Sequence, residues 1–225
     1  MAEKTMQKNF TAEIARAEPL RVQVARKLRE MLRLGHFDPG MRLTEKAVVE
    51  MLGVSRTPAR EALTALAESG VLDALDQGGY GVPQLTHRDI DELYKVRALL
   101  EIPALQTTVQ RADEALHGQL IACLENLKAA RDDAESSAFL EHVLAFRELL
   151  FNGCGNDLLM SLISRIDNHT EAVKVAALAD AKVRADIITI YGAMAEAVRA
   201  GDVERATVLL RAHHDDGRLA YHNRI

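Results

Sequence analysis

The chain has 225 residues, of which 48% are hydrophobic and only 4% aromatic, with no Trp. This composition is too apolar for a disordered chain and predicts a core of Leu, Ala, Val, Ile and Met, which suits packed helices. The net charge of −5 argues against a general polyanion binder, but residues 19–60 carry +5 and residues 89–225 carry −7. A local basic patch is expected where a protein contacts phosphates, although a solvated helix face would also explain it.

The N-terminal residues and the two cysteines indicate where the protein resides. Residues 1–10 are polar and lack an apolar signal core, and no apolar run approaches the ~18 residues that span a bilayer. Cys123 and Cys154 show no CxxC spacing, so they indicate neither a zinc knuckle nor a disulfide framework. Reduced thiols in a soluble, cytoplasmic protein are therefore expected.

The first elements along the chain predict a helix followed by a helix-turn-helix. Residues 1–18 are expected to form a flexible arm, and apolar residues recur at helical spacing over residues 20–32. Thr44 and Ser55 are suitable N-caps for two more helices. Gly53 lies between these helices and permits a sharp turn.

A hairpin signal follows the third helix. Two short segments, residues 71–75 and 80–83, flank Asp-Gln-Gly-Gly at residues 76–79, which is typical of a tight hairpin turn. Helix, helix-turn-helix and hairpin is the order of a winged helix, so residues 19–86 are predicted to form a winged helix-turn-helix domain.

The rest of the chain is predicted to be helical almost to its end, with Thr86 as the first cap. The pattern contains no strand signal, repeat or low-complexity stretch. About six helices are expected, over residues 87–111 with a bend near Pro103, and over 113–132, 136–152, 156–177, 181–200 and 202–221. The chain is thus predicted to be mainly α, with an all-helical bundle over residues 87–225 that binds an effector and dimerises.

The start of the third helix has the side chains that a DNA-reading helix needs. Arg56 and Arg60 lie four residues apart, hence on one face, and either guanidinium could bind guanine or clamp a phosphate. Thr57 can donate to a phosphate, Lys46 can reach the DNA backbone from the preceding helix, and Gly79 gives a narrow hairpin tip. The simpler alternative is an ordinary capped surface helix. The candidate DNA-binding residues are Lys46, Ser55, Arg56, Thr57, Arg60 and Gly79.

Two stretches of sequence resemble a known family. Residues 35–43, Gly-His-Phe-Asp-Pro-Gly-Met-Arg-Leu, and residues 52–63, Leu-Gly-Val-Ser-Arg-Thr-Pro-Ala-Arg-Glu-Ala-Leu, resemble the DNA-binding domain of the GntR family. Residues 92–101, Glu-Leu-Tyr-Lys-Val-Arg-Ala-Leu-Leu-Glu, resemble the first effector-domain helix of its FadR-like branch, the FCD type. The match continues through Phe146, Gly155-Asn156, Gly201-Asp202, Ala206 and His213.

This resemblance covers residues 20 to about 220 and implies a function. Members of the family are homodimers that release operator DNA when a metabolite, often an organic acid, binds. The positions that match DNA contacts in the family are Arg56, Thr57, Arg60 and Lys46, with Gly79 at the wing tip.

Many members of this branch also hold a divalent metal that grips the effector carboxylate, through an Asp-x3-His pair and two later His. The positions matching these ligands here are Val143, Arg147, Tyr191 and His213. Only His213 could ligate a metal, and one imidazole cannot hold an ion that needs three or four ligands. His142, His169 and His214 do not fall on matching positions. No metal or other cofactor is therefore expected.

The substitution at position 147 suggests another way to bind an anion. Arg147 places a fixed positive charge where the metal would be, and a guanidinium binds a carboxylate through two hydrogen bonds. Tyr191 could supply a hydroxyl and His213 a second donor, while Arg97 either lines the same pocket or pairs with an acidic residue. These four residues are the candidates for binding a small anionic effector. The alternative is that Arg147 forms a structural ion pair with a buried Glu or Asp.

Two other functions compete with a repressor of metabolic genes. An enzyme would need a catalytic constellation, but Cys154 lacks a placed base and residues 213–216, His-His-Asp-Asp, are more simply a solvated helix end. An architectural DNA-binding protein without an effector would have little use for a domain of residues 89–225. The sequence therefore favours a non-enzymatic, effector-responsive homodimer that binds double-stranded operator DNA.

Overall fold

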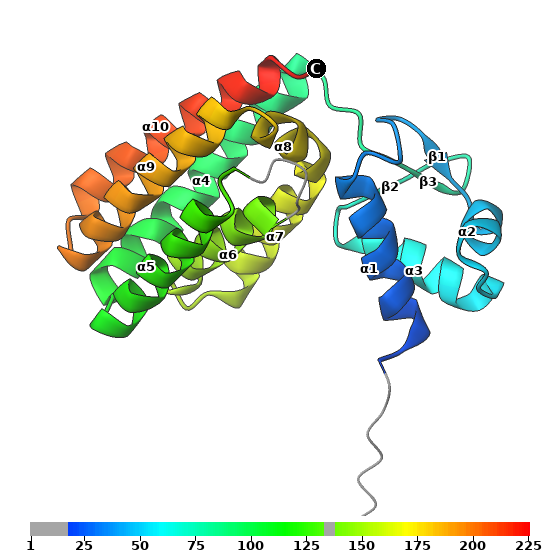
Figure 1. Cartoon of the computed structure of the whole chain (residues 1–225), viewed down its shortest axis with the longest axis horizontal. Coiled ribbons are helices and arrows are strands. Elements are labelled where there is room, and N and C mark those ends of the chain that lie inside the picture. The colour runs from blue at the N-terminus through cyan, green and yellow to red at the C-terminus, as the bar shows by residue number, and fades with distance from the viewer. Residues whose placement is uncertain (1–17, 133–137) are drawn as a thin grey trace, which may run out of the picture.

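The computed structural model describes residues 18–132 and 138–225. Figure 1 shows two bodies side by side, a small N-terminal one and a larger helical one, joined by a short linker after β3. Each body has its own apolar core. The flexible arm expected over residues 1–18 lies outside the described residues, except for Glu18.

The N-terminal body is a winged helix-turn-helix. Its sheet is antiparallel with strand order β1-β3-β2. The sequence pattern did not predict β1, because a strand of two residues is too short to show a period of two. The elements are α1 (Leu20–Arg33), β1 (Arg42–Leu43), α2 (Glu45–Leu52), α3 (Arg56–Glu68), β2 (Asp73–Ala74) and β3 (Tyr80–Gly81).

Local capping chemistry sets the turn between α2 and α3. The Thr44 hydroxyl accepts a hydrogen bond from the Ala47 backbone N–H at 3.2 Å, and Gly53 has the left-handed φ of 65° that the turn requires. Ser55 has the extended backbone of an N-cap, but its side chain makes no capping hydrogen bond, so the expected role of its hydroxyl was wrong. That hydroxyl remains exposed at the start of α3.

The C-terminal body contains seven helices in its described part. Thr86 and Asp89 form a reciprocal capping box that fixes the start of the first helix, as the sequence predicted for Thr86. The helices are α4 (His87–Arg111), α5 (Glu114–Ala129), α6 (Ala138–Asn152), α7 (Asp157–His169), α8 (Glu171–Leu178), α9 (Ala181–Arg199) and α10 (Val203–His222).

The single helix predicted over residues 156–177 is wrong, because the chain breaks at Thr170. Thr170 is fully buried, and its hydroxyl donates to the carbonyls of Ile166 and Asp167 at 3.1 and 3.2 Å. A hydroxyl that bonds the preceding turn competes with the helical backbone pattern and bends or ends a helix. Two helices, α7 and α8, therefore meet at a corner.

The bundle core is mostly aliphatic, as the composition indicated, with a few rings at its centre. Phe146 and Tyr191 stack with centroids 4.2 Å apart. The long helix α4 runs continuously through Pro103 and packs against α6, α7, α9 and α10, so its central residues are buried on several sides. Among the described residues, no helix is both long and apolar enough to span a bilayer.

Candidate functional site

The start of α3 presents the predicted DNA-reading side chains to the outside. Arg56, Thr57 and Arg60 are exposed together with Ser55, and within the described residues neither guanidinium makes an ion pair. Their charges are therefore available to a polyanion. Lys46 on α2 is 81% exposed and has only a loose pair with Glu50 at 3.7 Å.

The wing is held next to α3 by contacts that the sequence analysis missed. The Arg42 guanidinium donates to the carbonyls of Gln77 and Gly78, which fixes the hairpin tip beside β1. The Tyr80 hydroxyl lies 2.9 Å from the Thr64 hydroxyl, which ties β3 to α3. Gly79, the predicted wing-tip residue, has a left-handed φ of 83°.

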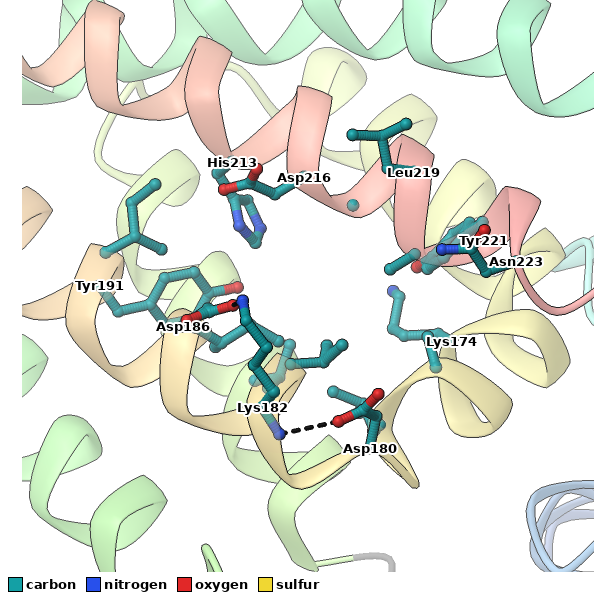
Figure 2. A pocket seen from close by; sticks show the side chains of 18 of the residues that line it. Lys174, Asp180, Lys182, Asp186, Tyr191, His213, Asp216, Leu219, Tyr221 and Asn223 are labelled. Carbon is teal, nitrogen blue, oxygen red and sulfur yellow. Dashed lines mark hydrogen bonds and ion pairs between the residues drawn. The ribbon is translucent and has the colours of Figure 1, made fainter.

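The helical domain contains a cavity of about 320 Å³ between α9, α10 and the α8 corner. Arg97, Arg147, Tyr191 and His213, the four effector candidates, all line it. Figure 2 shows Tyr191 and His213 on its wall. Val143, the remaining position that matches a family metal ligand, lines it too. The structure thus brings together residues that lie more than a hundred positions apart in the sequence.

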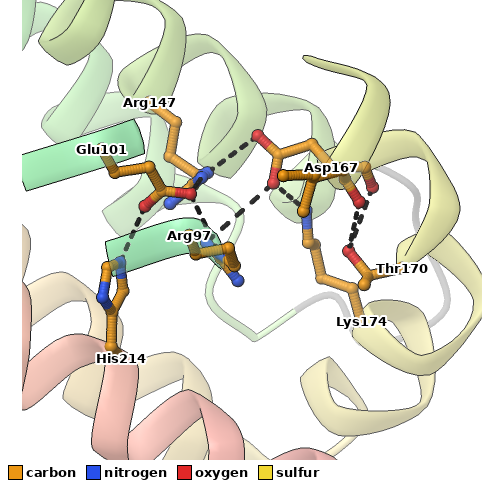
Figure 3. A network of polar contacts seen from close by, with 8 residues as sticks. Arg97, Glu101, Arg147, Asp167, Thr170, Lys174 and His214 are labelled. Carbon is orange, nitrogen blue, oxygen red and sulfur yellow. Dashed lines mark hydrogen bonds and ion pairs between the residues drawn. The ribbon is translucent and has the colours of Figure 1, made fainter. Parts of the chain in front are cut away.

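Behind this cavity lies a buried network of charges (Figure 3). Glu101 accepts from Arg97 Nε at 2.8 Å and from Arg147 Nη2 at 2.7 Å. Asp167 accepts from Arg147 Nε at 3.1 Å and from Lys174 Nζ at 2.9 Å. Arg147 therefore forms the structural ion pair that was the alternative to effector binding, and it does so with two buried acids while also lining the cavity.

The network holds three cations and two carboxylates. Although burial favours their neutral forms, Arg147 and its cationic neighbours hold the pKa of Glu101 well below its ordinary value and lower that of Asp167 to about 2. Burial, together with repulsion from Arg147, lowers the pKa of Lys174 despite its pair with Asp167. Such a shift is expected for a cation with too little negative charge around it.

One polar atom of the cavity lacks a partner. The Tyr191 hydroxyl is buried and makes no hydrogen bond to the described residues. Most buried polar groups are hydrogen-bonded, so an unpaired hydroxyl beside a cavity indicates a place where a ligand or water would accept or donate.

The family's metal does not fit these residues. Val143 has no atom that could coordinate a divalent ion, and the positive charge of Arg147 would repel one. Two of the four matching positions therefore cannot serve as ligands. Across the residues that the structure describes, no group of three or more His, Cys, Asp or Glu side chains could hold a metal. His142 and His169 lie elsewhere, with His169 next to Asp73 at 3.7 Å.

Three residues of the network had no predicted role. No site role was predicted for Glu101, Asp167 or Lys174, although Glu101 ends the stretch that resembles the FCD domain and follows Arg97 by four residues, a spacing that favours an ion pair on a helix. The interpretation of residues 213–216 as a solvated helix end was also wrong for its two histidines. His214 is buried and lies 2.8 Å from Glu101 Oε2, and His213 faces the cavity.

We expect the stability of the helical domain to fall as the pH drops below about 6.5. Burial, with repulsion from Arg147, holds the pKa of His213 well below 6.5, so the unfolded chain takes up this proton first. The contribution of neutral His213 is complete above that pH and is lost below it. Urea unfolding between about pH 5 and 7 should therefore show a smaller pH slope in His213→Gln than in wild type. His142→Gln is the control, and equal slopes in all three proteins would contradict the assignment.

A winged helix-turn-helix joined to a helical domain with a charged cavity defines a DNA-binding transcription regulator. Residues 20–82 match the family model described as bacterial regulatory proteins, gntR family, and residues 92–216 match the FCD domain. The chain belongs to the GntR family of bacterial transcription regulators, in the branch that carries an FCD domain.

Several known proteins are similar to this chain. It is 34% identical over 151 residues to the uncharacterized HTH-type transcriptional regulator YdhC of Bacillus subtilis, an alignment that covers 67% of each chain. It is 29% identical over 147 residues to the HTH-type transcriptional regulator McbR of Escherichia coli, covering 65% of this chain and 66% of McbR. It is 33% identical over 131 residues to the gluconate operon transcriptional repressor of B. subtilis, covering 58% of this chain and 51% of the repressor.

The solved structure of E. coli McbR/YncC has the same fold. It superposes with a TM-score of 0.78 over 92% of this chain and 99% of that one, at 24% sequence identity. The families and relatives matched are those of transcription regulators rather than of enzymes.

Proposed function

We propose that this regulator is a repressor that binds a twofold operator as a homodimer and leaves it when a small monocarboxylate enters the cavity. One relative carries the name of a repressor, that of the gluconate operon, which supports repression here. The observation that carries the effector proposal is the cavity itself, where the unpaired Tyr191 hydroxyl lies beside a cluster of excess positive charge.

The charge count favours a ligand with a single negative charge. Arg97, Arg147 and Lys174 supply three positive charges, and Glu101 and Asp167 neutralise two of them. One carboxylate would complete the balance, and a buried charge that is paired and hydrogen-bonded is far less costly than an unpaired one. Arg147, Tyr191 and His213 would hold it without a metal.

The walls and the mouth of the cavity favour an apolar body on that ligand. The walls include Leu178, Ile187 and Ile190, and the mouth carries Asp180, Asp186 and Asp216 against a single Lys182. Lys182 pairs with Asp186 at 2.6 Å (Figure 2 shows both). A second carboxylate on the ligand would meet these acids, so dicarboxylates should bind more weakly than monocarboxylates of equal length.

We expect Tyr191→Phe to weaken effector binding without destabilising the free protein. Removing a buried hydroxyl that has no partner costs the free protein nothing, whereas losing its bond to a bound carboxylate costs about 1.5–3 kcal/mol, roughly 10- to 150-fold in Kd. Thermal-shift screening with acetate, hexanoate, octanoate and benzoate, their amides and dicarboxylates of equal length would find the ligand, and calorimetry would compare the variants. Tight binding of a neutral amide, or unchanged binding in Tyr191→Phe, would contradict this site.

Homodimerisation is proposed for two reasons. One recognition helix reads only a few base pairs, so a twofold dimer on a palindrome is needed for selectivity. Val96 and Leu99 on α4 and Leu158 and Leu162 on the neighbouring α7 are also exposed, Leu99 by 74%. Large exposed apolar side chains on two helices in contact are what an interaction surface would use.

We expect light scattering to give twice the chain mass of 24.8 kDa for the wild type. Leu99→Glu should shift the protein to monomers, because a charge at the apolar contact would be buried without a partner. Val208→Glu, at an aliphatic position on α10 that is 61% exposed, should leave the mass unchanged. A monomeric wild type at micromolar concentration would rule out the dimer.

A further inference from the structure

We infer that the corner between α7 and α8, residues 165–174, connects the cavity to the DNA-binding domain, with Asp167 as its positioning residue. The inference rests on the proposed function, because it concerns how that cavity would act on operator binding. This short segment contacts the cavity residues on one side and the DNA-binding domain on the other.

On one side, the corner is attached to the cavity through Asp167. Its carboxylate accepts from Arg147 Nε at 3.1 Å and from Lys174 Nζ at 2.9 Å, and it lies 4.0 Å from Arg97 Nη2. All three cations line the cavity. Figure 3 shows that Asp167 reaches them from the end of α7, on the side of the network opposite His214.

On the other side, the corner makes hydrogen bonds to the C-terminal end of α3, the recognition helix. The Arg165 guanidinium donates to the Glu68 carbonyl at 2.6 Å, and the Asn168 amide donates to the Ser69 carbonyl at 2.9 Å. These carbonyls end α3, whose other end carries the DNA-reading arginines. A Cβ on Gly70, which has a φ of 83°, would lie only 3.0 Å from the Arg165 carbonyl, so the two backbones are in close contact.

The same corner also holds α1 and the small sheet. Glu171, the buried first residue of α8, pairs with Arg33 and lies 3.8 Å from Arg29 Nε, both on α1. His169 lies 3.7 Å from Asp73 of β2. A cavity of about 10 Å³ at this junction is lined by residues of both domains, among them Arg33 and Asn168. Figure 1 shows α8 on the side of the bundle that faces α1.

Helical spacing explains how one segment serves both sides. Arg165 and Asn168 are three residues apart and share a face, whereas Asp167 lies on another face of the same turn. Because a helical turn moves as a unit, displacement of Asp167 displaces Asn168 and Arg165 with it. The break at Thr170 leaves this turn free to tilt relative to α8.

A bound anion would act on Asp167 by competition. A carboxylate beside Arg147 and Lys174 would take N–H donors and positive charge that now hold Asp167. The weakened pull would let the end of α7 shift, and α3, about 20 Å long, would carry the shift to its DNA-reading end. An effector can bias this arrangement only by the difference between its affinities for the two positions of the corner.

Hydrogen exchange of the free, full-length protein tests the connection without effector or DNA. Lys174→Met removes one cation that holds Asp167, and it should raise amide exchange about threefold or more in residues 165–172 and in residues 66–74 of the other domain. Residues 45–52 should not change. Lys182→Met, the same substitution at the mouth of the same cavity, should leave all these segments as in wild type. Exchange that rises around the cavity while residues 66–74 stay unchanged would overturn the inference.

If Lys174→Met proves globally unstable, hydrogen exchange in a variant on the other side of the corner tests the same connection. Replacing Arg165 and Asn168 together by Ala removes the two bonds to α3, and coupling is reciprocal, so exchange in residues 171–178 of the cavity wall should rise. Arg205→Ala, at an exposed position on α10, is the control. Unchanged exchange in residues 171–178 of the double variant would also overturn the inference. Because neither test uses a ligand, its failure is separate from a failure to find a monocarboxylate effector.

Discussion

Glu101→Gln should lower the free energy of unfolding of the helical domain by about 3–5 kcal/mol, the cost of leaving a buried charge without its partner. Glu101 is 1% exposed, and it accepts hydrogen bonds from two guanidinium groups and lies 2.8 Å from the His214 imidazole. The variant would leave three buried cations facing a single carboxylate. The NH₂ group of the new Gln side chain would also face the guanidinium N–H donors that now bind the Glu101 carboxylate.

Urea unfolding followed by circular dichroism at neutral pH measures this change. Glu196→Gln is the matched control, because Glu196 also pairs with an arginine, at 2.6 Å, but lies 46% exposed on the surface of α9. Its unfolding midpoint should equal that of wild type, since exposed ion pairs contribute little. If Glu101→Gln unfolds at the wild-type urea concentration, the network does not hold the bundle together.

Arg56→Ala and Arg60→Ala should each weaken operator binding by about 1–3 kcal/mol, roughly 5- to 150-fold. Both side chains are exposed at the N-terminal end of α3, where a recognition helix meets base edges and phosphates first. If the lost contact is to a base, specificity should relax at one position of the operator. If it is to a phosphate, binding should weaken on all sequences and the salt dependence should become flatter.

Gel shifts on an operator selected from random DNA by the wild-type protein, repeated at several salt concentrations, distinguish these cases. Arg205→Ala in the helical domain controls for the loss of one positive charge far from α3. Wild-type affinity in both arginine variants would show that another surface reads the DNA.

The DNA-reading half of the molecule could be predicted almost completely. Its signals are local: Thr44 caps α2 by accepting from the N–H three residues ahead, Gly53 turns the chain, and Arg56 and Arg60 share a face because they are four residues apart. Such features depend on neighbours within one or two turns. The resemblance to the GntR family rests on the same ordered residues, and the family comparison confirmed it.

In this half, the prediction failed for the hydrogen bonding of one side chain, for one very short strand and for one contact between distant residues. The Ser55 hydroxyl makes no hydrogen bond to the helix that it was expected to cap, and β1 was too short to leave a pattern. Arg42 lies in a stretch that resembles the family. Its role in holding the wing depends on the Gln77 and Gly78 carbonyls, which lie 35 and 36 residues further along the chain.

The cavity required both kinds of information. The sequence, through the family resemblance, named Arg97, Arg147, Tyr191 and His213, and the fold places all four around one space. It could not say whether Arg147 faces a ligand or a buried acid. The fold gives it two acids, Glu101 from a helix 46 residues away and Asp167 from one 20 residues away.

By itself, therefore, the sequence determined most of the helices and where α3 begins, and it suggested which residue types would receive an anion. The tertiary structure alone decided the charge balance of the cavity, the break at Thr170 and the contact between the corner and α3. The physical reason is that capping and helical spacing are short-range, whereas the partner of a buried charge is whichever group the packing of distant helices brings within about 3 Å. Glu101, Asp167 and Lys174 have no periodic pattern that would link them before the chain is folded.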